Sequence, residues 1–147
     1  MPEKETIERA KRDKVQGKAA STQAGEFVRE EIEHIREGKH GARSTKQAIA
    51  IGLAKARRAG VKLRPPEQGT TSEETREQAE RDMRAGQHAG KKKSSKRSRA
   101  TLAALKKEGK SAASKTALSR QAHKAAAKRS AASRSRSAKK AAATRKK

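Results

Sequence analysis

The chain has 147 residues, with 40 Lys and Arg against 16 Asp and Glu, which gives a formal net charge of +24. It contains 29 alanines, one aromatic residue (Phe27) and no cysteine. So few bulky apolar side chains exclude one compact core running through the whole chain. The lack of cysteine excludes disulfides, thiolate catalysis and Cys-ligated zinc. The composition therefore favours a protein that binds a polyanion over a compact enzyme.

Charge divides the chain into three segments. Residues 1–66 carry a net charge of +7, residues 67–90 carry −3 and residues 91–147 carry +20. We predict a helical region over 1–66, an acidic helix or linker over 67–90, and a basic tail rich in Lys, Arg, Ala and Ser over 91–147. No stretch alternates as a strand requires. The expected fold is mainly α, with a small helical hairpin or bundle at the N-terminus and a long low-complexity tail, disordered or forming frayed helices.

Two helices are predicted before residue 38. Opposite charges four residues apart support a solvated first helix near residues 3–16. Ser21 and Thr22 predict the start of a second helix that runs to Glu37, with Gly38 just past its end. On this second helix the apolar residues fall on one side, and the face expected to be polar carries Glu26, Glu30, Glu33 and Glu37.

A third helix completes the predicted hairpin. Ser44 predicts its N-terminal cap, and it runs to about Ala59, where Gly60 predicts its end. Small residues such as Gly52 permit close approach of a partner helix. The residues expected to face one another are Phe27, Val28, Ile32 and Ile35 on the second helix and Ile49, Leu53 and Ala56 on the third.

Further helices are predicted after the hairpin, with fewer apolar residues to pack against it. Thr71 and Glu74 have capping-box spacing, which predicts a fourth helix over residues 72–85. In the tail, residues 99–107 and 112–129 favour helix by composition, and Gly109 separates them. Repulsion between like charges predicts that these helices fray in the free protein, and the low-complexity composition predicts no packed core in the tail.

The sequence offers little chemistry for an enzyme. Glu31 and His34 have the spacing of a di-iron ligand pair on a helix, but no second such pair exists, so we interpret His34 as a solvated side chain. No Walker loop, dinucleotide-binding glycine motif or Gly-x-Ser-x-Gly elbow occurs. We therefore expect no enzymatic activity, no catalytic residue, no cofactor and no metal.

One short loop has the features of a phosphate clamp. Two glycines would let a backbone approach, cations would supply charge, and the following helix would offer free N–H groups. The residues are Gly38, Lys39, Gly41, Arg43 and Lys46. The alternative interpretation is a helix stop followed by a turn. A KH fold, which uses such a loop, also needs a sheet that this sequence does not predict.

The basic tail is the strongest functional signal. Its charge predicts sequence-nonspecific binding to duplex phosphates, driven by counterion release, and its lack of aromatic residues disfavours stacking on single strands. The expected contacts are Lys91, Lys92, Lys93, Lys96, Arg97, Arg99, Lys106, Lys107, Arg120, Lys124, Lys128, Arg129, Arg134, Arg136, Lys139, Lys140, Arg145, Lys146 and Lys147. Two alternatives stay open: an RNA- or ribosome-associated basic protein, and a disordered stress or interaction protein that docks through the N-terminal hairpin.

Two resemblances accompany these features. Residues 20–63, which include the segments STQAGEFVREE (21–31) and STKQAIAIGL (44–53), resemble a bacterial family of small basic proteins that has no assigned function. Residues 91–147 resemble the linker-histone-like tails of bacterial nucleoid proteins, although this tail contains no proline. The second resemblance implies a histone-like, nucleoid-associated protein.

The same features predict location and partners. The first residues contain acids and no apolar signal-peptide core, and the longest bulky apolar cluster, residues 48–56, falls far short of the roughly 18 residues that a membrane span needs. We therefore expect a cytoplasmic, nucleoid-associated protein. Its expected partner is double-stranded DNA, with RNA as an alternative and no membrane. Its N-terminal helices are candidates for forming a homo-oligomer.

Overall fold

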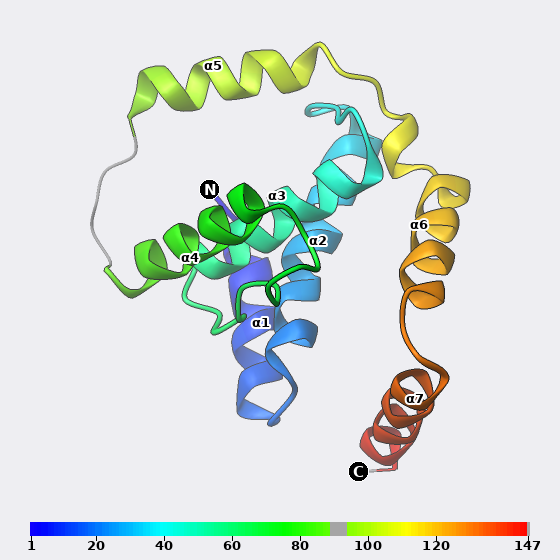
Figure 1. The fold of residues 1–147 in the computed structure, drawn as a ribbon. Coiled ribbons are helices and arrows are strands. Elements are labelled where there is room, and N and C mark those ends of the chain that lie inside the picture. The colour runs from blue at the N-terminus through cyan, green and yellow to red at the C-terminus, as the bar shows by residue number, and fades with distance from the viewer. Residues whose placement is uncertain (89–93, 147) are drawn as a thin grey trace.

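Figure 1 shows the computed structural model, which describes residues 1–88 and 94–146. Over these residues all regular structure is helical and no strand occurs. This confirms the predicted mainly α fold. In chain order the elements are α1 (Lys4–Val15), α2 (Ala20–Glu37), α3 (Thr45–Arg58), α4 (Glu73–Gln87), α5 (Ser95–Lys106), the short 3-10 turn η1 (Ser111–Ala113), α6 (Lys115–Ala127) and α7 (Ala131–Arg145).

The first core surrounds the single aromatic side chain. Phe27 on α2 is 1% exposed and packs with Ala10 of α1, Ala56 of α3 and Val61, which follows α3. These contacts fasten three helices together. Phe27 therefore lies at the centre of this first core.

Helices α2 and α3 form the predicted hairpin through a very close contact. A Cβ placed on Gly52 would lie 2.6 Å from the Cα of Val28, so a larger residue at 52 would push the two helices apart. The buried stripe of α3 runs along Thr45, Ala48, Gly52 and Ala56. It is rotated from the predicted stripe through Ile49 and Leu53, because the small residues give the closer helix packing.

Helix α1 is not the solvated helix that its charge pairs predict. Thr6, Ala10 and Asp13 on one of its sides are buried. The helix packs against α2 and covers part of the face predicted to be polar. Glu30 is consequently only 2% exposed, and its Oε2 accepts a hydrogen bond from the Glu3 N–H at 3.1 Å.

The tail differs most from the prediction. The described residues 94–146 form α5, η1, α6 and α7, so the structure does not confirm a disordered or frayed tail. The expectation that the tail has no packed core is wrong at η1. There Ala112 is 5% exposed and Ala113 is fully buried, in a second core cluster with Ile35 of α2 and Ala48 of α3. Alanine is small enough to fit against the closely packed hairpin.

Serine N-caps define where the tail helices begin, although the composition of the tail does not indicate these positions. The side chains of Ser94, Ser114 and Ser130 each accept a hydrogen bond from the backbone N–H three residues further on. Such N-caps satisfy donors that a helix end would otherwise leave unpaired. The predicted helices over 99–107 and 112–129 thus begin at Ser95 and Lys115, and α7 was not predicted.

Helix α4 packs against α3. The Asp82 carboxylate accepts a hydrogen bond from Arg58 Nε at 2.6 Å, and a Cβ on Gly86 would lie 2.0 Å from the Arg57 carbonyl oxygen. The cap of α4 is Ser72, whose Oγ accepts from the Thr75 N–H, and not the predicted Thr71. The acidic segment therefore contributes a packed helix to the N-terminal body.

A membrane crossing needs a long apolar helix. Among the helices of residues 1–88 and 94–146, none combines the required length with the required apolar character.

Candidate nucleic-acid interface

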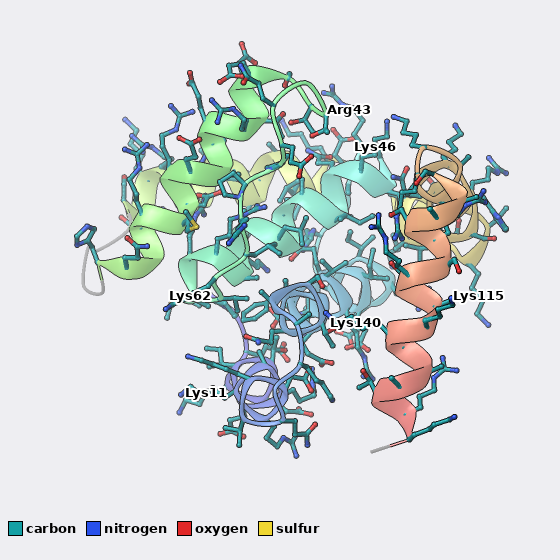
Figure 2. All side chains as sticks on the ribbon, turned by 60° about the horizontal axis from the view of Figure 1, so that its bottom comes forward. Lys11, Arg43, Lys46, Lys62, Lys115 and Lys140 are labelled. Carbon is teal, nitrogen blue, oxygen red and sulfur yellow. The ribbon has the colours of Figure 1, made fainter. Side chains whose placement is uncertain are left out.

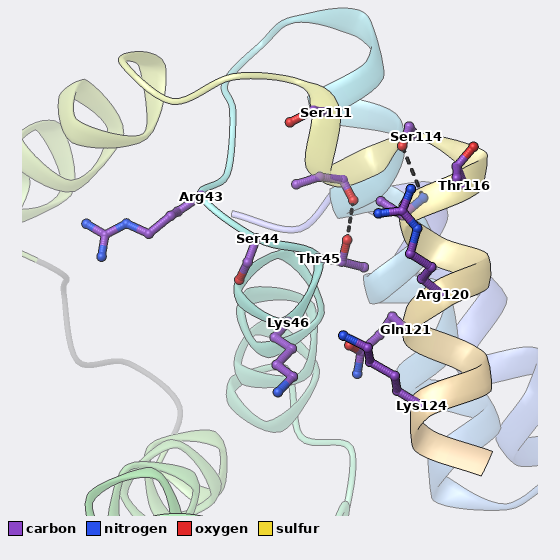
Figure 3. Close-up of a pocket in the computed structure, with 12 residues that line it drawn as sticks. Arg43, Ser44, Thr45, Lys46, Ser111, Ser114, Thr116, Arg120, Gln121 and Lys124 are labelled. Carbon is purple, nitrogen blue, oxygen red and sulfur yellow. Dashed lines mark hydrogen bonds between the residues drawn. The ribbon is translucent and has the colours of Figure 1, made fainter. Parts of the chain in front are cut away.

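An open groove of about 490 Å³ lies where the tail meets the N-terminus of α3 (Figure 3). One wall comes from the start of α3 and the two residues before it, and the other comes from η1 and the first turns of α6. The groove is lined by Arg43, Ser44, Thr45, Lys46, Ser111, Ala112, Ser114, Thr116, Ala117, Arg120, Gln121 and Lys124. Residues about 70 positions apart in the sequence thus share one surface.

Hydrogen bonds hold η1 against the start of α3 and the end of α2. Thr45 Oγ1 donates to the carbonyl oxygen of Ala112 at 2.7 Å, and Arg36 Nε donates to the carbonyl oxygen of Ala113 at 2.9 Å. Both acceptors belong to η1. The turn therefore fixes the start of α6 beside the start of α3.

Two helix N-termini open into this groove. Ser44 caps α3 and Ser114 caps α6, and both serines line the groove. The N-terminus of a helix carries a partial positive charge and backbone N–H groups, both of which favour an anion. Hydroxyl groups of Ser111 and Thr116 add polar contacts, whereas the hydroxyl group of Thr45 already donates to Ala112.

The charged side chains of the groove are all cationic. Arg43, Lys46, Arg120 and Lys124 line it, and no acidic residue does. Lys46 of α3 and Lys124 of α6 point toward the same space, whereas Arg43 points to the other side of the α3 N-terminus (Figure 3). The nearest acid to Arg43 is Glu108, at 3.9 Å from its Nε. The groove therefore suits phosphate oxygens.

The structure places only some residues of the predicted phosphate clamp in the groove. Arg43 and Lys46 line the groove. Lys39 is turned toward acids, with its Nζ 3.0 Å from Glu37 and 3.3 Å from Glu3. The hydrogen bond to Glu37, followed by that to Glu3, raises the pKa of Lys39.

The two clamp glycines receive the tail of the same chain. The N–H of Gly41 donates to the carbonyl oxygen of Leu105 at 2.9 Å, and a Cβ on Gly41 would lie 2.0 Å from the Glu108 carbonyl oxygen. A Cβ on Gly38 would meet the ammonium of Lys110 at 2.6 Å. The space that these glycines leave is therefore occupied by the backbone at residues 108–109 and by the side chain of Lys110.

The predicted tail contacts are exposed wherever the structure describes them. Lys91, Lys92, Lys93 and Lys147 lie outside the described residues. Every Lys and Arg of residues 94–146 is exposed, and none of them forms an ion pair within the part of the chain that the structure describes. Figure 2 shows their side chains extending outward along α6 and α7.

Some of these cations form a row. Arg120, Lys124 and Lys128 are four residues apart, which places them along one side of α6 and just past its end. Successive members are about 6 Å apart along the helix axis. The first two also line the groove, so the row continues the groove along α6.

Sequence reasoning missed the groove as a unit. It identified Arg43 and Lys46 in one segment and Arg120 and Lys124 in another, but nothing in the local sequence joins them. It also missed Thr45, Ser111, Ser114 and Thr116. One usable signal was Ser114, which precedes a helix-favouring segment at N-cap spacing.

No family model, curated protein or solved structure matches this chain. The two resemblances noted in the sequence therefore stay predictions.

Proposed function

We propose that this protein binds nucleic acid without sequence specificity, with duplex DNA as its main partner in a histone-like, nucleoid-associated role. The observation that carries the proposal is the set of exposed cations on α5, α6 and α7 that have no acidic partner among the described residues. A cation without an ion pair is free to neutralise a phosphate. The release of condensed counterions then drives binding regardless of base sequence.

The groove between α3 and α6 would be the main binding site for the phosphate backbone. Lys46, Arg120 and Lys124 present donors to one backbone segment, together with the hydroxyl groups of Ser111 and Thr116 and the two helix N-termini. Arg43 would contact the backbone on the other side of the α3 N-terminus. Contacts of this kind position a protein on nucleic acid and carry no sequence information. The row on α6 would follow the backbone from there.

The burial of the single aromatic residue favours duplex over single-stranded nucleic acid as the partner. Proteins that bind single strands stack the bases on aromatic side chains. Here Phe27 is the single aromatic residue of the chain, and it is buried in the α1–α2–α3 core at 1% exposure. No Phe, Tyr or Trp side chain is therefore left to stack on a base.

Removing the groove cations tests whether the groove is the main binding site. We expect R43Q/K46Q/R120Q/K124Q to weaken duplex binding by at least about tenfold at 150 mM salt. It should also reduce the slope of log K against log salt by up to about 3.6, because four phosphate contacts are lost. Fluorescence anisotropy with a labelled duplex over a range of salt concentrations measures both quantities.

The matched control removes the same charge from another surface. Lys4, Lys11, Arg12 and Lys14 on α1 are exposed, and K4Q/K11Q/R12Q/K14Q also changes the net charge by four. This variant should change the slope much less. Equal losses in the two variants would show that only total charge matters and that the groove is not a centre of binding.

Competition between duplexes tests the lack of specificity. We expect unrelated duplexes of equal length to compete with affinities that agree within a few-fold, because the contacts are to phosphates and not to base edges. A preference of more than roughly 100-fold for one sequence would contradict the proposal. If RNase, and not DNase, releases the protein from nucleic acid in a lysate, the main partner is RNA and not DNA.

A further inference from the structure

A second polar cluster lies away from the groove, between α2 and the loop that follows it. Glu31, His34 and His40 each offer one ligand atom, and these three atoms lie within 4.8 Å of one another. Glu31 is 1% exposed and His40 is 9% exposed, while His34 is half-buried. The sequence showed only the Glu31–His34 spacing, because His40 reaches the cluster through the fold of the loop.

The hydrogen bonds of His40 define which nitrogen is free. His40 Nδ1 lies 3.0 Å from the carbonyl oxygen of Gly41, which can only accept, so Nδ1 carries a hydrogen. In the neutral ring the lone pair is then on Nε2. This atom lies 3.0 Å from Glu31 Oε1, which is buried and has no hydrogen-bond donor.

A metal ion would satisfy both of these atoms. Two ligands bound at about 2.1 Å with tetrahedral geometry lie about 3.4 Å apart, so a small outward shift from the observed 3.0 Å would admit the ion. The other oxygen, Glu31 Oε2, is already bound by Lys55 Nζ at 2.6 Å. The unsatisfied oxygen of Glu31 therefore faces the free nitrogen of His40.

The second histidine is oriented in the same manner. His34 Nε2 lies 2.9 Å from the carboxylate oxygen Oε1 of Glu3. Histidines that bind metals generally donate their other ring N–H to a carboxylate or a backbone carbonyl, which fixes the ring and raises its basicity. Glu3 would serve His34 in this way, and the Gly41 carbonyl serves His40.

Charge also favours a cation at this position. Glu30 and Glu31 are both almost fully buried, and the cation that they share is Lys55, at 3.7 Å from Glu30 and 2.6 Å from Glu31. Glu30 Oε1 has no hydrogen-bond partner either. Buried carboxylates are costly unless charge compensates them, and a divalent ion would supply that charge.

We propose that Glu31, His34 and His40 bind a divalent transition-metal ion of the zinc class. Two imidazoles and a carboxylate are ligands that Zn²⁺ takes readily, with water in a fourth position. The ion would join α2 to the loop at residues 38–42. Because Gly41 and Ala42 donate to the carbonyl oxygens of Leu105 and Gly109, the ion would also fasten the loop on which the tail docks.

The test uses the full-length protein, stripped with a chelator and titrated with Zn²⁺ by calorimetry. We expect one equivalent to bind, the melting temperature to rise, and amide exchange at Gly41 and Ala42 to slow. Co²⁺ should give the intense visible absorption of a four-coordinate site. A net charge of +24 disfavours adventitious cation binding, so binding of one equivalent would indicate a specific site. A failure to bind Zn²⁺ at one equivalent would overturn the proposal.

Variants locate the binding. The chain has four histidines, and H88Q/H123Q removes the two exposed ones outside the cluster, so this variant should bind Zn²⁺ unchanged. H40Q and H34Q should each weaken binding by at least about 100-fold. His34 is only half-buried, so H34Q tests the site even if H40Q does not fold. Loss of binding in H88Q/H123Q, or its retention in H34Q, would contradict the assignment.

Discussion

Truncation after Ala127 is expected to weaken duplex binding by at least about 100-fold at 150 mM salt. The deletion removes α7 and nine cations, and no residue of α7 is buried. It keeps the groove and Leu118, which packs against the second core cluster. The helical body should therefore stay folded while much of the electrostatic attraction is lost.

The salt dependence measures this loss directly. If the intact protein neutralises about ten phosphates, the slope of log K against log salt should be about −9, and losing half of those contacts should bring it to roughly −4.5. Fluorescence anisotropy between 50 and 300 mM salt gives the slope. Thermal melting by circular dichroism checks that the truncated body is folded.

A charge-preserving variant is the control for the truncation. R134K/R136K/R145K keeps the charge of α7 and changes only the geometry of its donors. Nonspecific neutralisation of phosphates depends on charge, so this variant should bind almost as tightly as the unchanged protein. If the truncated protein binds at 150 mM salt as tightly as the intact chain, the tail is not the main binding element.

Local signals predicted three of the four helix ends of the hairpin, because each of them acts within one turn of a helix. The predicted start at Ser21 and Thr22 is wrong, since α2 begins at Ala20 without a side-chain cap. Gly38 adopts a left-handed conformation (φ 80°) at the end of α2, as a C-terminal glycine does, and Ser44 caps α3. Both positions could be read from residue type and spacing alone. The same holds for the end of α3, where Gly60 has φ 91°.

Contacts between distant segments could not be read in this way. Glu30 has the sequence environment of a solvated residue, and it is buried only because the start of the chain packs beside it. The glycines at 38 and 41 were predicted to let a phosphate backbone approach, but the groups close to them are the side chain of Lys110 and the backbone of residues 108–109 of the same chain. The proposed metal site, which needs His40 beside Glu31, likewise depends on how the loop folds back.

The tail shows how composition can mislead about order. Its Ala, Ser, Lys and Arg content indicated low complexity, yet the positions of Ser94, Ser114 and Ser130 define three helix starts. The burial of Ala112 and Ala113 depends on a surface that α2 and α3 create together. Only a complementary surface elsewhere in the fold distinguishes these alanines from the many exposed ones.

Phe27→Ala is expected to lower the free energy of unfolding by about 3–5 kcal/mol, the usual cost of truncating a buried Phe. Phe27 and Ile35 are the largest apolar side chains that are fully buried. The neighbours of Phe27 at the centre of the core are mainly alanines, which cannot fill the space that the ring leaves. A marginally stable body of this size should lose most of its cooperative structure.

Urea denaturation of the full-length protein, followed by circular dichroism, measures this cost. The control is Leu102→Ala on α5, where the side chain is 42% exposed and where alanine favours the helix, so stability should change by less than about 0.5 kcal/mol. At low salt the F27A variant should still bind duplex DNA, because the cations of α5, α6 and α7 remain. An unfolding midpoint equal to that of the unchanged protein would show that Phe27 does not hold α1, α2 and α3 together, and the first core would have to be placed elsewhere.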